Sequence, residues 1–354
     1  MCEITLCIIN HNGAAHLRHA FAALAAQHWR FAEVLIVDDA STDDSLEVVA
    51  RLCPHARVLR LERNAGPGAA RNAGVAAARH DLILFQDNDV RLEADTAALL
   101  LEDLAAHPEA LAVAPRVVDA VEPSRVHFDS ADCHFLGLMA TRHAGAELAA
   151  LDDAAAETTS LVTTCFLIDR ARWKGDGPLF DDSLGFNLED HDFGVRACLT
   201  GHRLRVNPRA RVLHGGGTPG LSYRPGCRPS EKRQFYLTRN RWLLVLKCFS
   251  TRTLLVLAPA FVFFEVLQLA WLAGQGRASV WRRAVGSLWL RRRELAAERR
   301  AVQGSRRVPD GAVLRGGPLP VTPHVREAGL GRIGVRLANG LLSLYWRGAA
   351  RWIA

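Results

Sequence analysis

Residues 33–43 join a short apolar segment directly to a group of acidic and hydroxyl side chains: Glu33-Val34-Leu35-Ile36-Val37-Asp38-Asp39-Ala40-Ser41-Thr42-Asp43. An apolar, β-prone run this short predicts a buried strand, and the polar residues mark its end. Similar runs lie at 4–9, 58–61 and 82–85, and helical segments are expected at about 14–27, 45–52 and 67–79. Because strand and helix alternate, the sequence predicts an α/β fold with a mostly parallel central sheet flanked by helices.

Acidic residues follow two of these strands, at the carboxyl ends where ligands bind in such sheets. Asp38 and Asp39 follow the second strand, and Asp87 and Asp89 follow the fourth. Two carboxylates one residue apart supply oxygen ligands suited to Mg²⁺ or Mn²⁺, and such a cation would neutralise a diphosphate. The alternatives are an exposed turn for the second pair and simple helix capping for residues 41–43.

Two further candidates lie in the middle of the chain. Glu189, Asp190 and Asp192 open a helix expected at about 188–200. The helix dipole explains part of this acidic cluster, but an ionised carboxylate there also suits a general base. His214 ends a short apolar run, where a histidine can complete a metal site or simply pack.

A glycine-rich loop enters the helix expected at 67–79. Its glycines, which include Gly66, fit neither the P-loop nor the dinucleotide fingerprint. We interpret it as a turn whose backbone approaches a ligand closely, with Arg71 on the first turns of the helix. A simple strand-to-helix connection is the alternative.

Residues 1–230 are expected to form one catalytic domain with halves at about 1–110 and 111–230. Short strands are expected in the second half at 111–113, 161–168, 204–206 and 212–214. Residues 215–230, rich in Gly, Pro and Ser, predict a lid. The eight cysteines contain no Cys-x-x-Cys pair, and no basic segment precedes the first strand. We therefore expect a reducing compartment and no cleaved signal peptide.

Charge separates the rest of the chain from this domain. Residues 231–354 carry 22 Lys and Arg against 6 Asp and Glu, a balance of +16, although the whole chain carries only +7. Within this region, residues 253–274 are apolar except for Glu265 and Gln268. About 20 such residues can cross a bilayer, but the central glutamate costs roughly 2–4 kcal/mol in hydrocarbon.

Arginines and tryptophans surround the apolar segment, a composition typical of surfaces at the lipid headgroup level. They are Arg252, Arg277, Arg282, Arg283, Arg291, Arg292, Arg293, Arg299 and Arg300 with Trp271, Trp281 and Trp289. Interfacial or re-entrant membrane attachment is favoured over a true span and over a buried soluble helix. Residues 335–354 form a second amphipathic segment. An anionic membrane surface is thus the expected partner, and nucleic acid is not.

Taken together, these motifs resemble the family 2 inverting glycosyltransferases of GT-A fold in order and spacing. The resemblance covers about residues 3–250 and rests on five motifs, namely 37–43, 63–74, 87–89, 188–192 and 212–214, together with the opening run 7–13 and Arg239-Asn240-Arg241. The subgroup it looks most like includes rhamnosyltransferases that build bacterial surface polysaccharides. It implies a Rossmann-like nucleotide-diphospho-sugar transferase fold, followed here by a helical, membrane-associating extension at 231–354.

The resemblance implies roles for the matched residues. Those that would bind the nucleoside-diphosphate sugar are Asn10, Asn12, Asp38, Asp39, Asn64, Gly66, Arg71 and Asp87. Asp89 and His214 would hold a divalent Mn²⁺ or Mg²⁺ ion. Asp190 would deprotonate the acceptor hydroxyl, and Glu189 would position the acceptor. Asn88 is a spacer position that need not bind anything, and Gln86 stands where an apolar residue is expected.

The implied reaction transfers a sugar, with inversion, to a hydroxyl of a glycan or polyprenyl-linked acceptor in cell-surface polysaccharide biosynthesis. Such an acceptor places the enzyme at the cytoplasmic face of the cell membrane, as a peripheral or re-entrant protein. The competing interpretation is a catalytically silent, membrane-attached scaffold of a polysaccharide assembly complex. The sequence specifies neither the donor base and sugar nor the oligomeric state.

Overall fold

The apolar run at the start of the chain forms strand β1 (Ile4–Asn10), every residue of which is buried. Its neighbours on both sides are parallel to it: β2 (Glu33–Asp38) and β4 (Leu82–Asp87). Strand β3 (Arg57–Arg60) adds a further parallel neighbour beyond β2. Burial of β1, β2 and the middle of β4 explains why these three strands are apolar on both faces, whereas β3 is partly exposed. The parallel pairing confirms the expected parallel core.

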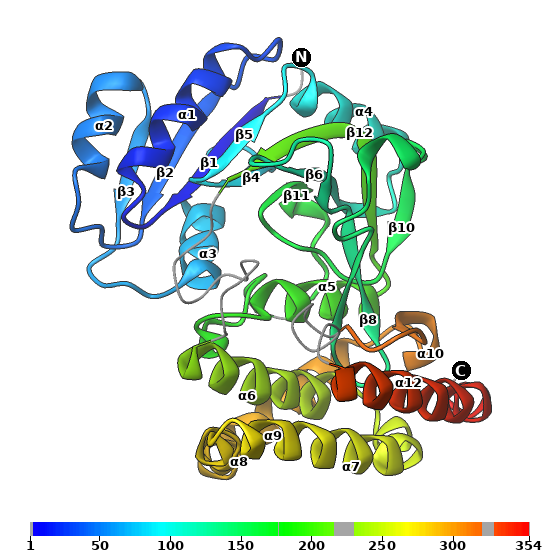
Figure 1. Ribbon diagram of the computed structural model, residues 1–354. Helices are drawn as coiled ribbons and strands as arrows, with labels where there is room; N and C mark the ends of the chain where they lie inside the picture. Colours follow the sequence, from blue (N-terminus) through cyan, green and yellow to red (C-terminus); the bar gives the residue numbers. More distant parts are fainter. Residues whose placement is uncertain (1–2, 176, 216–229, 321–328, 354) are drawn as a thin grey trace. The chain divides into compact units, whose positions relative to one another are not determined.

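Helices cover both faces of this parallel core (Figure 1). The helices concerned are α1 (Ala14–Ala25), α2 (Ser45–Leu52) and α3 (Pro67–Ala77). Ile4, Leu6 and Ile8 share a buried cluster with side chains of α1 and α2. On the opposite face, α3 lies so close to β1 that a Cβ at Gly74 would stand 2.7 Å from Cys7 Sγ. This close approach requires glycine at position 74.

The remaining strands make the sheet mixed. Within the described residues the ten-stranded sheet runs β10-β12-β6-β11-β4-β1-β2-β3, with β5 on β12 and β7 on β6. The additional elements are β5 (Val90–Leu92), α4 (Thr96–Ala106), β6 (Ala110–Asp119), β7 (Val126–Phe128), β10 (Ala156–Thr158), β11 (Cys165–Asp169), α5 (Glu189–Leu199) and β12 (Arg203–His214). Strand β11 is antiparallel to both β4 and β6.

Two strand predictions in this part were wrong in extent. The strand expected at 161–168 begins only at Cys165, and the backbone carbonyl of Thr163 instead accepts a hydrogen bond from Arg71 at 3.0 Å. The two strands expected at 204–206 and 212–214 are one strand, β12, with an irregularity in its pairing to β6 between Asn207 and Arg211. The irregularity interrupts the alternation of apolar residues, and for this reason the sequence predicted two short strands instead of one.

The structure is a computed structural model that describes residues 3–175, 177–215, 230–320 and 329–353. The chain divides into two units: residues 1–131, 141–197 and 202–217 in the first, and 132–140, 198–201 and 218–354 in the second. The second unit therefore contains two short segments from within the region expected to be catalytic. Most of the expected lid lies outside the described residues.

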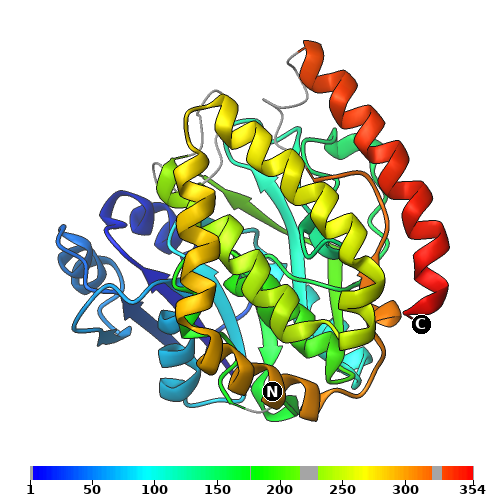
Figure 2. The same ribbon diagram turned by 90° about the horizontal axis from the view of Figure 1, so that it is seen from below.

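The second unit consists mainly of helices (Figure 2). They are α6 (Glu231–Cys248), α7 (Thr251–Gly274), α8 (Ala278–Leu290), α9 (Arg292–Ser305), α10 (Asp310–Val313) and α12 (Gly329–Ala349). A small sheet, β13-β8-β9, accompanies them, with β8 (Ser130–His134), β9 (Met139–Arg142) and β13 (Leu314–Arg315). Helix α7 is long and apolar enough to cross a membrane by length and composition. Only 22% of its most apolar 18-residue segment is buried within the protein.

Candidate active site

The parallel register places the ends of β1, β2 and β4 at one edge of the sheet. Asn10 pairs with Asp38 across β1 and β2, and Ile9 pairs with Asp87 across β1 and β4. The fully buried Asp38 accepts hydrogen bonds from Asn10 Nδ2 at 2.9 Å and from the backbone N–H of Ser41 at 3.1 Å. Asp38 therefore fixes the positions of Asn10 and Ser41 at this edge of the sheet.

Asp39 ties the end of β2 to the glycine-rich loop. Its Oδ1 accepts the backbone N–H of Ala65 at 2.7 Å, and its Oδ2 accepts that of Gly66 at 3.0 Å. Gly66 has a φ of 91°, and a Cβ there would lie 2.2 Å from the carbonyl oxygen of Gly185. The loop can take this path only with glycine at position 66.

His11 links the two remaining asparagines of the expected donor site, a role that the sequence did not indicate. His11 Nδ1 lies 2.7 Å from the carbonyl oxygen of Asp39, so this nitrogen carries the proton and donates. His11 Nε2 is then an acceptor, 3.0 Å from Asn64 Nδ2 and 3.3 Å from Asn12 Nδ2. Asn12 Oδ1 accepts the backbone N–H of Thr42 at 2.7 Å.

Two residues of the 86–89 segment have structural explanations. Asn88, a spacer that need not bind anything in the acidic motif, donates from Nδ2 to Asn10 Oδ1 at 2.9 Å and so holds the site residue Asn10. Gln86 donates from Nε2 to the carbonyl oxygen of Val90 at 2.9 Å and is buried. Its amide therefore holds the turn between β4 and β5, which aims the acidic residues.

Arg71 connects the end of β4 to the start of α5. Its guanidinium donates to Asp87 Oδ1 at 2.6 Å, and its Nη1 lies 3.7 Å from Glu189 Oε1. Burial raises the pKa of Asp87 to about 6, against the opposing effect of Arg71. The charge of Asp89 raises this pKa further, and that of His214 lowers it, so all four side chains belong to one electrostatic cluster.

The carboxylates at the start of α5 belong to the same electrostatic cluster. Burial raises the pKa of Asp190 to about 6, and burial together with the charge of Asp190 raises the pKa of Glu189 to about 8. Asp87 and Arg71 act on both groups. At neutral pH the coupled pair therefore shares about one proton, and the higher pKa of Glu189 favours that residue as the proton's position.

Asp89 and His214 approach each other at the ends of the paired strands β5 and β12. His214 Nε2 lies 3.3 Å from Asp89 Oδ2, and both side chains are largely buried. Burial alone would lower the pKa of His214, but the hydrogen bond and charge of Asp89 outweigh it and raise that pKa. The pair is thus an oxygen and a nitrogen donor aimed at one point.

His127 lies behind His214 and was missed by the sequence reasoning. The two rings stack at a centroid distance of 5.0 Å, and their Nδ1 atoms are 3.0 Å apart. Burial and the charge of His214 lower the pKa of His127 to about 4, so its ring is neutral at pH 7. A neutral His127 that accepts at Nδ1 keeps the proton of His214 on Nδ1 and leaves Nε2 facing Asp89.

The comparison with protein families covers strands β1 to β11, but not α5 or β12, which carry Glu189, Asp190 and His214. Residues 5–171 match the family model described as Glycosyl transferase family 2. The match covers just under half of the chain, which in this segment is similar to the family 2 glycosyltransferases. The succinoglycan biosynthesis protein ExoO of Rhizobium meliloti (strain 1021) is 35% identical over 101 residues, which are 28% of this chain and 29% of that protein. That match spans less than a third of either protein.

Solved structures show the fold of this chain. GalNAc-T7 with UDP, GalNAc and Mn²⁺ matches with a TM-score of 0.57 and 17% identity, over 72% of this chain and 49% of that one. S. aureus TarS 1-349 in complex with UDP-GlcNAc matches with a TM-score of 0.53 and 16% identity, over 98% and 92%. At these identities the likeness establishes the GT-A fold, which confirms the fold expectation.

The donor set of the candidate site, Asp89 and His214, fits a divalent cation. Adjacent ligands of an octahedral ion bound at 2.0–2.1 Å lie about 3 Å apart, close to the spacing of His214 Nε2 and Asp89 Oδ2. Carboxylate and imidazole are ligands that Mn²⁺ accepts. Among the residues that the structure describes, no cluster of three or more His, Cys, Asp or Glu side chains is placed to hold a metal ion.

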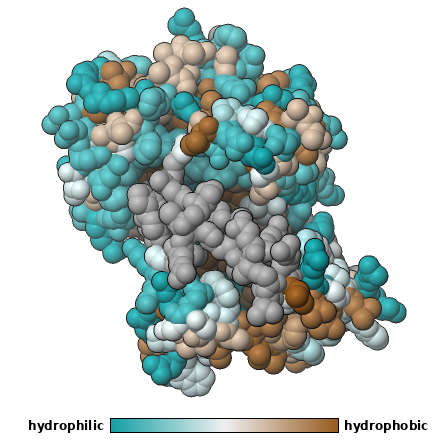
Figure 3. Space-filling model, in the orientation of Figure 1, coloured by the Kyte–Doolittle hydropathy of each residue, from teal (hydrophilic) through white to brown (hydrophobic). Residues whose placement is uncertain are grey.

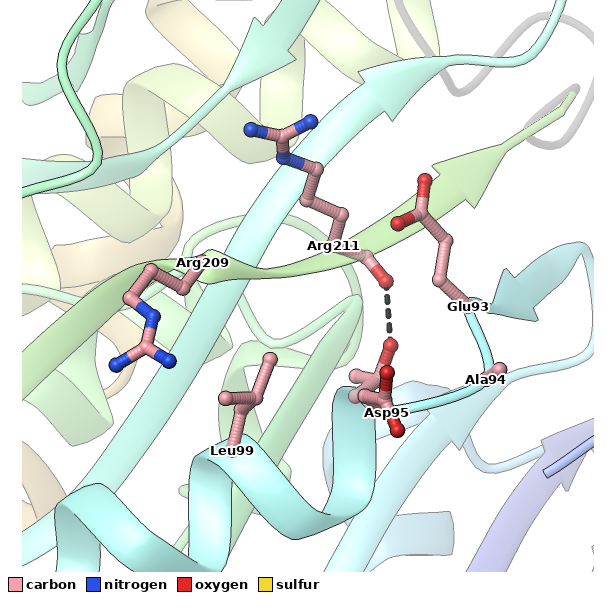
Figure 4. Close-up of a pocket in the computed structure, with 7 residues that line it drawn as sticks. Glu93, Ala94, Asp95, Leu99, Arg209 and Arg211 are labelled. Atoms are coloured by element: carbon pink, nitrogen blue, oxygen red, sulfur yellow. Dashed lines mark hydrogen bonds between the residues drawn. The ribbon is translucent and has the colours of Figure 1, made fainter. Parts of the chain in front are cut away.

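A shallow surface pocket of the same unit is separate from these groups. Figure 4 shows it lined by Glu93, Asp95, Leu99, Arg209 and Arg211, and the hydroxyl of Thr96 donates to the backbone carbonyl of Arg211 at 2.6 Å. The guanidinium of Arg211 is already paired with Asp153 at 3.0 Å. None of the expected donor, metal or catalytic residues lines this pocket, so substitutions here leave the candidate site unchanged.

Proposed function

We propose that this glycosyltransferase moves a hexosyl or rhamnosyl-type sugar from a nucleoside-diphosphate sugar to a hydroxyl of a glycan or lipid-linked acceptor, with inversion, in cell-surface polysaccharide biosynthesis. The observation that carries the proposal is the convergence of Asp89 and His214 with Arg71, Asp87 and the carboxylates of α5 at one edge of the sheet. The match to ExoO, a succinoglycan biosynthesis protein, supports the polysaccharide role.

The donor would lie along the ends of β1, β2 and β4. Asn10 and the loop held by Asp39 would frame the base and ribose, while Arg71 would hold Asp87 toward the sugar and diphosphate. A divalent cation bound by Asp89, His214 and the diphosphate oxygens would supply charge stabilisation for the leaving group. UDP and Mn²⁺ in the GalNAc-T7 structure, and UDP-GlcNAc in the TarS complex, support both expectations.

The transfer would be a single in-line displacement. Asp190 takes the proton of the acceptor hydroxyl, whose oxygen attacks the anomeric carbon from the face opposite the diphosphate. The bond from that carbon to the diphosphate oxygen breaks as the new bond forms, so configuration inverts. Glu189, neutral at pH 7, would donate a hydrogen bond that orients the acceptor without adding a second charge.

The deciding experiment is calorimetric binding of UDP, GDP and dTDP to the full chain, with and without Mn²⁺. We expect one nucleotide to bind at least about tenfold more tightly with Mn²⁺, and Asp89→Ala to abolish this metal dependence. The control is Asp95→Ala, since Asp95 lines the pocket of Figure 4 and forms an exposed pair with His28 at 2.8 Å. Absence of binding by all three nucleotides would contradict the proposal and favour the silent scaffold.

A second prediction concerns the residue behind the metal pair. His127→Ala is expected to weaken the Mn²⁺-dependent binding by about 10- to 100-fold, because His214 then loses the acceptor that orients its ring. The same titrations measure it, with His28→Ala as the matched control. Unchanged Mn²⁺ affinity in a folded His127→Ala protein would show that the stack is only packing.

A further inference from the structure

Helix α7 is interrupted by two polar residues, and both point into the second unit. Glu265 pairs with Arg241 of α6 and accepts a hydrogen bond from Trp281 Nε1 of α8 at 2.6 Å. Gln268 donates to the hydroxyl of Thr238 of α6 at 3.0 Å. The face of α7 that remains exposed therefore has no polar side chain between Arg252 and Trp271. It consists of Leu255, Ala258, Pro259, Val262, Val266, Leu267, Ala270 and Trp271.

Helix α12 presents a second exposed apolar stripe. Ile333, Leu337, Leu341 and Leu344 recur at helical spacing, and Ala338 and Leu342 are buried on the other side of the helix. The exposed fractions of these four residues and of Leu255, Val262 and Val266 lie between 58% and 72%. An amphipathic helix that turns an apolar stripe outward needs a partner to cover it.

The two stripes belong to neighbouring helices. The hydroxyl of Tyr345 on α12 donates to the backbone carbonyl of Val256 on α7, and the helices lie side by side in Figures 1 and 2. Figure 3 shows hydrophobic surface along the edge of the second unit where α7 lies. We call these exposed faces of α7 and α12 together the apolar face.

The distribution of charged side chains around the apolar face indicates which kind of partner covers it. All five carboxylates that the structure describes within residues 231–353 are paired with an arginine: Glu231, Glu265, Glu294, Glu298 and Asp310. Exposed arginines flank the apolar face instead, at Arg252, Arg336, Arg347 and Arg351. Exposed Trp352 follows α12. An apolar stripe bordered by arginine and tryptophan matches the boundary between acyl chains and anionic headgroups.

We infer that the apolar face docks the protein onto a bilayer containing anionic lipids, with α7 and α12 lying in the plane of the interface. Spanning by α7 is excluded from this proposal because its other face is occupied by Arg241, Thr238 and Trp281 of helices that carry many charges. The negative surface potential of the cytoplasmic leaflet makes that leaflet the expected location. The proposal concerns the second unit and does not depend on glycosyl transfer.

Sedimentation of the full chain with vesicles tests the inference. We expect binding to vesicles with about 30% phosphatidylglycerol to exceed binding to pure phosphatidylcholine by at least about tenfold, and to weaken with added salt. Val262→Gln/Val266→Gln combined with Leu337→Gln/Leu341→Gln should lower the partition coefficient at least about tenfold. The control is Val121→Gln, because Val121 is the most exposed large apolar residue of the first unit, at 85%.

Two further measurements keep the outcome decisive. The thermal midpoint of the quadruple variant should match that of the wild type, because the replaced side chains are exposed. Wild-type tryptophan emission should be quenched by lipids with brominated acyl chains, a readout that needs no variant. Wild type that binds neither vesicle, or a stable dimer that the quadruple variant dissociates while vesicle binding is absent, would overturn the inference. Loss of nucleotide binding would bear on the first unit alone.

Discussion

Asp190→Asn is expected to lower kcat by about 10²- to 10⁴-fold, the usual contribution of a general base, while nucleotide affinity stays within a few-fold. Asparagine keeps the oxygen that accepts the backbone N–H of His191 at 2.7 Å but cannot take a proton from the acceptor. The measurement is the rate at which nucleoside diphosphate is released from the donor identified by calorimetry. The variant should bind donor normally and turn over very slowly.

The neighbouring carboxylate provides the matched control. Burial and the charge of Asp190 raise the pKa of Glu189 to about 8, so glutamine imitates the neutral form that Glu189 already has at pH 7. Glu189→Gln should therefore keep most of the activity at that pH. If Glu189→Gln lost a thousandfold or so and Asp190→Asn lost little, the two roles would be reversed.

The pH dependence follows from the same groups. Burial raises the pKa of Asp190 to about 6, so the base is protonated below that pH and kcat/KM should fall there. A raised carboxyl pKa means that the folded state binds the proton more tightly than the unfolded state. Ionisation thus costs stability as pH rises from the unfolded value of about 4 through the folded value. Asp190→Asn removes this cost, and its thermal midpoint at pH 8 should not fall below that of the wild type.

The sequence predicted the parallel half of the fold well because burial leaves a strong local signal. The runs at 4–9, 33–37 and 82–85 became β1, β2 and β4, and the helix expected at 45–52 is α2. Register then brought Asp38, Asp87 and Asn10 together, as strand ends in a parallel sheet must. The mixed half was less predictable, because β11 takes its place between β4 and β6 through long-range pairing.

The supporting residues of the candidate site could not be predicted from spacing. His127 lies 87 positions from His214, and no pattern around either residue points to the other. Asn88 resembled a spacer until the structure placed its amide beside Asn10. The sequence indicated only that Glu265 is costly to bury in an apolar helix, because its partner Arg241 lies on a different helix. Local sequence thus indicated the acidic residues, while tertiary packing determined which groups orient them.

Glu265→Ala is expected to lower the free energy of unfolding by about 3–5 kcal/mol, the usual cost of stranding one partner of a buried ion pair. Arg241 is 1% exposed, and burial lowers its pKa to about 10 even beside Glu265. Its remaining polar contact is the carbonyl oxygen of Leu136 at 2.7 Å, which cannot neutralise the charge. Urea and thermal unfolding followed by circular dichroism measure the loss.

Two further variants separate charge burial from general disruption. Arg241→Met/Glu265→Met should recover most of the stability because no unpaired charge remains, although Trp281 Nε1 loses an acceptor at a cost of about 1 kcal/mol. Glu231→Ala, which breaks the exposed pair with Arg283, should cost less than about 1 kcal/mol. A cost this small for Glu265→Ala would mean that water reaches the pair. The side of α7 that carries Glu265 would then not be sealed from water inside the unit.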